Sequence, residues 1–106
     1  MRSIRILFDF DGGALLIQRR FLVLDDNQVY LMGYPLPLSP TERQILTFLC
    51  TDPCPTPERI QASLDREISR ACLNVHIYSI NKKAKAISGR LLVDMTLGIY
   101  HLNPNM

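Results

Sequence analysis

The stretch "CLNVHIYSINKKAKAISGR", residues 72–90, decides the fold of this chain. Its apolar residues recur every three or four positions, which is the interval of a single buried helix face: Leu73, Ile77, Ile80, Ala84 and Ile87. Ser69 is a residue type that caps a helix at its start, and Gly89 is one that ends it. The sequence therefore predicts a long helix with one face in the core and the rest free for a partner.

The segments "LLVDMT" and "LGIYHL" follow this helix. Residues 91–93 and 99–102 are β-prone, and "DMTLG" between them indicates a turn aided by Gly98. We expect a two-stranded hairpin after the long helix.

The N-terminal third predicts a small antiparallel sheet. Short apolar runs cover residues 4–10, 15–17, 21–24 and 29–32, and "DDNQ" at 25–28 is typical of a turn. The following "GYPLPL" should be stiff and extended, because each proline fixes its own backbone torsion and restricts the residue before it.

Two shorter helices are predicted between the sheet and the long helix. "SPTE" is a capping box with a proline at the first helical position, so a helix should run over residues 40–50. Thr56 and Pro57 start another that passes Ile60 and Leu64. We expect a core of Ile45, Leu46, Leu49, Ile60, Leu64, Leu73, Ile77, Ile80 and Ala84.

The length and the net charge of the chain limit the functions it can have. The chain has 106 residues, 47% of them hydrophobic, which suits one domain. Twelve basic and ten acidic residues leave a net charge of +2, so a basic surface must be local. No apolar run reaches the roughly 18 residues of a membrane span, and three cysteines fit reduced thiols. We expect a cytoplasmic protein without a membrane partner.

Four segments resemble the DNA-binding effector domain of OmpR/PhoB-type response regulators in order and spacing: "PLPLSPTERQILTFL", "TPERIQASL", "LNVHIYSINKKAK" and "LGIYHL". The resemblance covers residues 28–102. It implies an α+β winged helix-turn-helix of bacterial type, with an N-terminal antiparallel sheet at 1–34, three helices at 39–89 and a C-terminal β-hairpin wing at 91–102. No receiver domain precedes these segments, so we expect a stand-alone domain that phosphorylation does not switch.

The resemblance also implies a function. In the family the third helix enters the major groove of DNA and the wing touches the backbone. The chain departs from the family on the helix, where arginines are usual at the positions of Tyr78 or Ser79 and of Asn81. It also departs in the wing, where a basic residue and two glycines are usual and this chain has Thr96, Leu97 and Ile99. Phosphate contacts supply most of the affinity for duplex DNA, so we expect weakened binding.

We expect double-stranded DNA to meet the C-terminal half of the third helix. Lys82, Lys83 and Lys85 would contact phosphates, and Tyr78 and its polar neighbours would offer weak base contacts. The candidate DNA-binding residues are Cys72, Val75, His76, Tyr78, Ser79, Asn81, Lys82, Lys83, Lys85, Arg90 and Thr96. Lysines at a helix end can also simply complement its dipole, and a lone helical histidine is as often a half-buried structural residue.

Other functions remain open at this point. A winged helix that has lost DNA binding could act as a protein-interaction or dimerisation module, which the neutral Cys72, Val75 and Ser79 and an apolar wing would favour. An exposed edge strand and paired half-sites favour a homodimer. Cys50, Cys54, Cys72 and His76 are the residue types of a four-ligand zinc site, although their spacing is not that of a standard site. A buried structural thiol explains Cys50 more simply.

Catalysis has little support in the sequence. Asp9 and Asp11 in "FDFDGG" lack the accompanying residues of a phosphotransfer site and are better explained as exposed carboxylates near a turn. We expect no enzyme activity, no catalytic residue, no metal and no cofactor.

Overall fold

The computed structural model describes residues 5–8, 15–19, 21–25 and 28–103, and these form an α+β winged helix. An antiparallel sheet comes first, followed by three helices and a two-stranded hairpin, as the sequence predicts. The elements are β1 (Arg5–Phe8), β2 (Leu15–Arg19), β3 (Leu22–Leu24), β4 (Val29–Leu31), β5 (Tyr34–Pro35), α1 (Pro40–Thr51), α2 (Pro57–Ser63), α3 (Arg70–Ser88), β6 (Val93–Thr96) and β7 (Ile99–Leu102).

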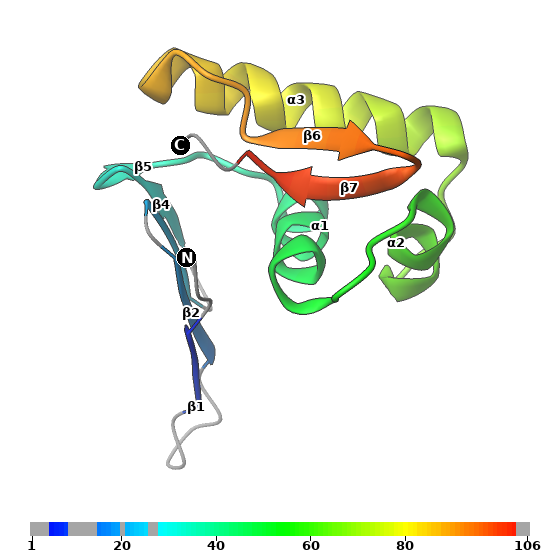
Figure 1. Ribbon diagram of the computed structural model, residues 1–106, viewed down its shortest axis with the longest axis horizontal. Helices are drawn as coiled ribbons and strands as arrows, with labels where there is room; N and C mark the ends of the chain where they lie inside the picture. Colours follow the sequence, from blue (N-terminus) through cyan, green and yellow to red (C-terminus); the bar gives the residue numbers. More distant parts are fainter. Residues whose placement is uncertain (1–4, 9–14, 20, 26–27, 104–106) are drawn as a thin grey trace.

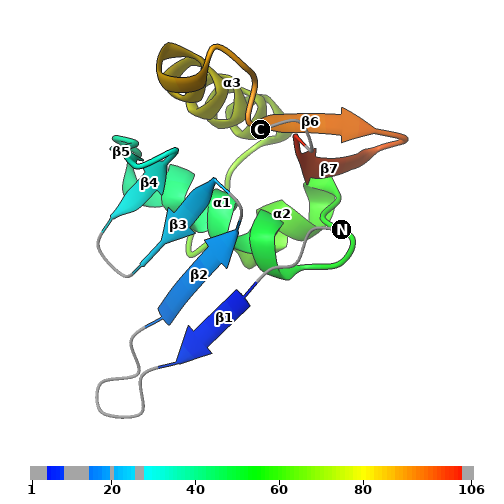
Figure 2. The same cartoon turned by 60° about the vertical axis from the view of Figure 1, so that its left-hand side comes forward.

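The sheet follows chain order, from β1 at one edge to β5 at the other, and Figure 2 shows the strands side by side. Asp25 forms the expected turn, because its carboxylate accepts a hydrogen bond from the backbone N–H of Gln28 at 2.6 Å. One strand was not predicted. The segment "GYPLPL" contributes β5, in which Tyr34 pairs with Leu31 across a two-residue turn. An edge strand tolerates Pro35, since its outer N–H would have no partner.

The helices begin where the sequence predicts. Ser39 and Glu42 form the capping box of α1: the Glu42 N–H donates to the Ser39 hydroxyl at 3.2 Å, and the Ser39 N–H donates to the Glu42 carboxylate at 2.9 Å. Thr56 and Ser69 cap α2 and α3. Gly89 ends α3 in the left-handed conformation, with φ 76°. Among the described residues, no helix has both the length and the apolar character needed to cross a membrane.

The wing is longer than expected. Its pairing runs from Val93–Leu102 to Thr96–Ile99, so "DMT" belongs to β6 and only two residues make the turn. Leu97 and Gly98 have φ values of 55° and 79°, the pattern of a type I′ turn. The sequence indicated a looser loop because Asp94 is a weak strand former, whereas pairing with β7 decides the strand.

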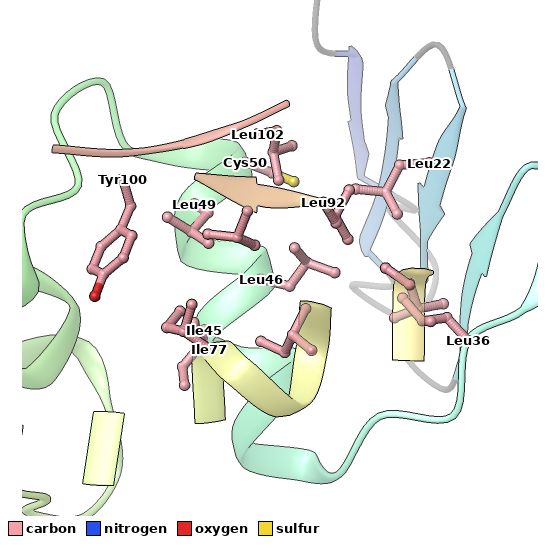
Figure 3. Close-up of a cluster of buried hydrophobic side chains, with 14 of the residues drawn as sticks. Leu22, Leu36, Ile45, Leu46, Leu49, Cys50, Ile77, Leu92, Tyr100 and Leu102 are labelled. Atoms are coloured by element: carbon pink, nitrogen blue, oxygen red, sulfur yellow. The ribbon is translucent and has the colours of Figure 1, made fainter. Parts of the chain in front are cut away.

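One hydrophobic cluster joins the sheet, the helices and the wing. Every residue of the predicted core is buried in it, apart from the half-buried Leu64 that packs against it. Figure 3 shows how Ile45 and Leu46 of α1 point toward the same space as Ile77 of α3 and Leu92. Cys50 is also buried there. Asp9 and Asp11 lie outside the described residues.

Candidate functional site

One face of α3 is open to solvent along its length (Figure 1). After Arg70, an exposed first residue that pairs with Glu58, the exposed residues follow helical spacing and form a solvent-facing stripe: Ala71, Asn74, Val75, Tyr78, Lys82, Lys85 and Ala86. Val75 and Tyr78 are 65% and 67% exposed, which is high for large apolar side chains. No acidic residue occurs in α3, from Arg70 to Ser88. The stripe is therefore apolar where the helix begins and basic toward its end.

The basic part of the stripe consists of exposed side chains. Lys82 and Lys85 make no salt bridge within the described part of the chain, and Arg90 lies exposed just beyond the helix. Three positive charges are thus available to an anionic partner. This is fewer than the sequence suggested.

Lys83 has an internal partner. Its ammonium donates to the Glu42 carboxylate at 2.8 Å, and the Glu42 side chain is only 5% exposed. Burial acts to raise the pKa of Glu42, but hydrogen bonds from the side chains of Lys83 and Ser79 and from the Ser39 backbone outweigh it and lower the pKa below its usual value. Lys83 and Ser79 are therefore used to join α3 to α1, and neither is free for the expected DNA contact.

Asn81 also has an internal role. Its side-chain oxygen accepts hydrogen bonds from the backbone N–H groups of Leu92 and Val93, at 3.0 and 2.8 Å, and its amide nitrogen donates to the Val93 carbonyl at 2.9 Å. Both ends of the amide therefore bind the first residues of the wing. This geometry does not fit the expected base contact, which needs the same two atoms.

The wing lies beside α3 in a defined direction. Asn81 contacts the base of the hairpin, whereas Asn74, two turns earlier, accepts a 3.4 Å hydrogen bond from the Tyr100 hydroxyl. The tip therefore points toward the end at which α3 begins (Figure 1). The backbone N–H of Tyr100 also donates to the Pro55 carbonyl at 2.9 Å, which fixes the hairpin to the loop between α1 and α2.

The outer part of the wing is exposed from Asp94 to Gly98. Thr96, a candidate for DNA contact, is hydrogen-bonded to the His101 ring at 2.8 Å across the hairpin. Leu97 is 96% exposed. From Asp94 to Gly98 the wing thus offers a carboxylate, a hydroxyl and two large apolar side chains, Met95 and Leu97, but no cation.

Two further candidates for DNA contact are half-buried. Cys72 and His76 lie on the flank of α3, between the stripe and the core. Cys54 is exposed and Cys50 is buried, and no three His, Cys, Asp or Glu side chains of the described residues gather as a metal site would require. The four possible zinc ligands, Cys50, Cys54, Cys72 and His76, therefore do not gather into a metal site.

The contact of Lys83 with Glu42 was missed by the sequence reasoning. Its two residues are 41 positions apart, and Glu42 was interpreted only as part of the capping box. A signal was present, because Lys83 lies one turn before the end of α3 on the same side as Ser79, whereas Lys82 and Lys85 belong to another face.

No family model and no curated protein sequence matches the chain. A solved structure does resemble it: the response regulator DrrB, an OmpR/PhoB homologue from Thermotoga maritima, with a TM-score of 0.66 and 22% sequence identity. The match covers 83% of this chain and 44% of that one. The chain thus corresponds to less than half of DrrB. At this identity the likeness shows the winged-helix fold and leaves the function to be argued from the residues.

Proposed function

We propose that this chain is a duplex DNA-binding domain of a transcription regulator, with the solvent-facing stripe of α3 in the major groove. The observation that carries the proposal is the stripe itself: it is exposed along the whole helix, free of acids and basic toward its end. A helix of this kind fits the major groove, which is wide enough to admit it. The likeness to a response regulator of the OmpR/PhoB type supports the proposal.

The exposure of individual side chains on α3 supports a division of contacts between phosphates and bases. Lys82, Lys85 and Arg90 meet phosphates, because they are the exposed cations at this end of α3. Val75 and Tyr78 face base edges, where apolar groups suit the thymine methyl. Because Lys83 is engaged by Glu42, affinity is modest and depends on few phosphate contacts.

The test compares two neighbouring lysines by fluorescence anisotropy on mixed genomic fragments at low salt. Lys82→Ala should weaken binding to every fragment and lower the salt slope by about one unit. Lys83→Ala is the matched control: at a temperature where the variant is folded, its salt slope should equal that of the wild type. An equal loss of slope in both variants would contradict this division of contacts.

A protein-interaction module is the second candidate, favoured by the exposure of Val75 and Tyr78. Absence of DNA binding by the wild type at low salt would reject the first proposal in its favour, because nonspecific phosphate attraction does not require a cognate site. The DNA-binding proposal also includes a cytoplasmic location and a homodimer on two half-sites. Light scattering that gives a monomer at high concentration, with and without DNA, would reject the dimer.

A further inference from the structure

The tip of the wing carries a leucine that the fold does not explain. Leu97 has a φ of 55°, in the left-handed region that bulky residues avoid, and it is followed by Gly98 in the same region. A type I′ turn favours Asn or Asp at this position. With 96% of the residue exposed, the side chain adds nothing to the core. Leu97 therefore opposes the turn without a compensating contact in the described chain.

The hairpin carries this side chain away from the body. Val93 and Tyr100 are the last buried residues of its two strands; Ile99 beyond Tyr100 is half-buried, and residues 94–98 are exposed. At about 3.3 Å per residue, Thr96 at the end of β6 lies roughly 10 Å beyond Val93 along the hairpin, and Leu97 follows it in the turn. A Cβ added to Gly98 would meet no atom within 4 Å, so the space beside the turn is open.

The position of the tip selects a place on DNA. The Asn81 and Asn74 contacts hold the wing along one flank of the exposed stripe of α3. With the stripe in a major groove, that flank faces the adjoining backbone and the minor groove beyond it. The minor groove is about 6 Å wide, enough for a narrow turn with one side chain at its end.

We propose that Leu97 inserts between base pairs from the minor groove and bends the duplex. This inference rests on the proposed DNA binding. Apolar side chains used in this way partly unstack one base step and kink the DNA by roughly 20–90°. The exposed residues 94–98 include no cation that the negative potential of the minor groove would attract. Insertion of the apolar Leu97 side chain is therefore the contact that this turn can make. Pyrimidine–purine steps such as TA are the preferred sites, because they unstack most easily.

A partner protein fits this tip less well than DNA does. Protein-docking patches are contiguous apolar areas of several hundred Å². Leu97 instead stands between the hydrogen-bonded Thr96 and Gly98, with the Asp94 carboxylate further back on the same hairpin. Leu97 and the less exposed Met95 behind it make only a small apolar area, and one apolar side chain at the end of a two-residue turn matches a slot between two base pairs.

The experiment uses Leu97→Asn, which improves the turn while removing the wedge. Energy transfer between dyes at the two ends of a short duplex containing TA steps reports bending, and anisotropy reports affinity at several salt concentrations. We expect the variant to melt a few degrees higher, to bind about tenfold more weakly with an unchanged salt slope, and to bend the duplex much less. Opposite changes in stability and binding would mark Leu97 as a functional residue.

Met32→Asn is the matched control. Met32 occupies the same position of the turn between β4 and β5, with φ 53° followed by Gly33, and is 47% exposed. This variant should also melt higher, but bind and bend DNA as the wild type does. The Leu97 inference fails, and DNA binding stands, if Leu97→Asn bends the duplex as the wild type does or if the wild type binds without bending. It fails together with the proposed function if the wild type does not bind at all. If Leu97→Asn keeps its DNA affinity but loses self-association in light scattering, the side chain contacts a second copy instead.

Discussion

Two faces of α3 contain polar residues of similar kinds and use them differently. On the flanks, Ser79, Asn81 and Lys83 are half-buried and bind other parts of the chain. On the solvent-facing stripe, Tyr78 and Lys82 are exposed and make no hydrogen bond or salt bridge with the described part of the chain. The difference shows that residue type alone does not mark a partner-binding residue. Position relative to α1 and the wing decides it.

Among variants that test this difference, Asn81→Ala should have the largest effect on stability. Asn81→Ala should lower the free energy of unfolding by about 3 kcal/mol, because it leaves three backbone groups at the start of the wing without their partner. Urea unfolding measures the change. Asn74→Ala is the control, and it should stay within about 0.5 kcal/mol because Asn74 is exposed and its bond to Tyr100 is long. Similar losses in the two variants would refute the distinction.

A smaller loss is expected at Lys83. Lys83→Met should destabilise the fold by about 1–2 kcal/mol, since it leaves the buried Glu42 carboxylate without its cation; the value is reduced because Lys83 is itself one-third exposed. Lys82→Met, one residue earlier on the stripe, should change stability by less than about 0.5 kcal/mol. Thermal or urea unfolding of the pair gives the answer. If Lys82→Met is the more damaging change, the assignment of the two lysines is wrong.

The effect of pH on the stability of the fold through Glu42 should be smaller than the effect of Lys83→Met. Its pKa in the folded state lies below the value of 4.5 for an unperturbed side chain, so its charged form stabilises the fold above that pH. This contribution is lost as pH falls through the folded-state pKa. The stability advantage of the wild type over Glu42→Gln should therefore be constant near neutral pH and shrink below about pH 4.5. An advantage that grows in acid would contradict the assigned ion pair.

The smallest effect on stability is expected on the stripe. Tyr78→Ala should leave the free energy of unfolding within about 0.5 kcal/mol of the wild type, because the ring is mostly exposed. Its affinity for DNA should nevertheless fall several-fold, by about 1 kcal/mol for a lost base contact. Calorimetry and anisotropy on the same preparation separate the two. A stability loss comparable to that of Asn81→Ala would place Tyr78 with the structural residues.

The local patterns of the sequence determined the elements. The intervals between apolar residues in α3, the capping box at Ser39 and the glycine at position 89 act over a few neighbouring residues, and each gave an element close to its observed bounds. They also identified which face of α3 is buried. β5 and the full length of β6 were missed, because a short strand exists only through the strand that pairs with it.

The tertiary structure alone decided how the polar residues of α3 are used. Helical spacing places Lys82 and Lys83 on different faces of α3, but the order of residues does not show that Glu42 binds Lys83 or that Asn81 reaches the wing, since these partners are brought near by the packing of α1, α3 and the hairpin. Hydrogen bonds and ion pairs act over about 3 Å, whereas the partners here are 11 to 41 residues apart in the chain. The sequence therefore determined a winged helix with one buried face on its long helix, and the packing determined which polar side chains of that helix bind other parts of the chain and which stay exposed.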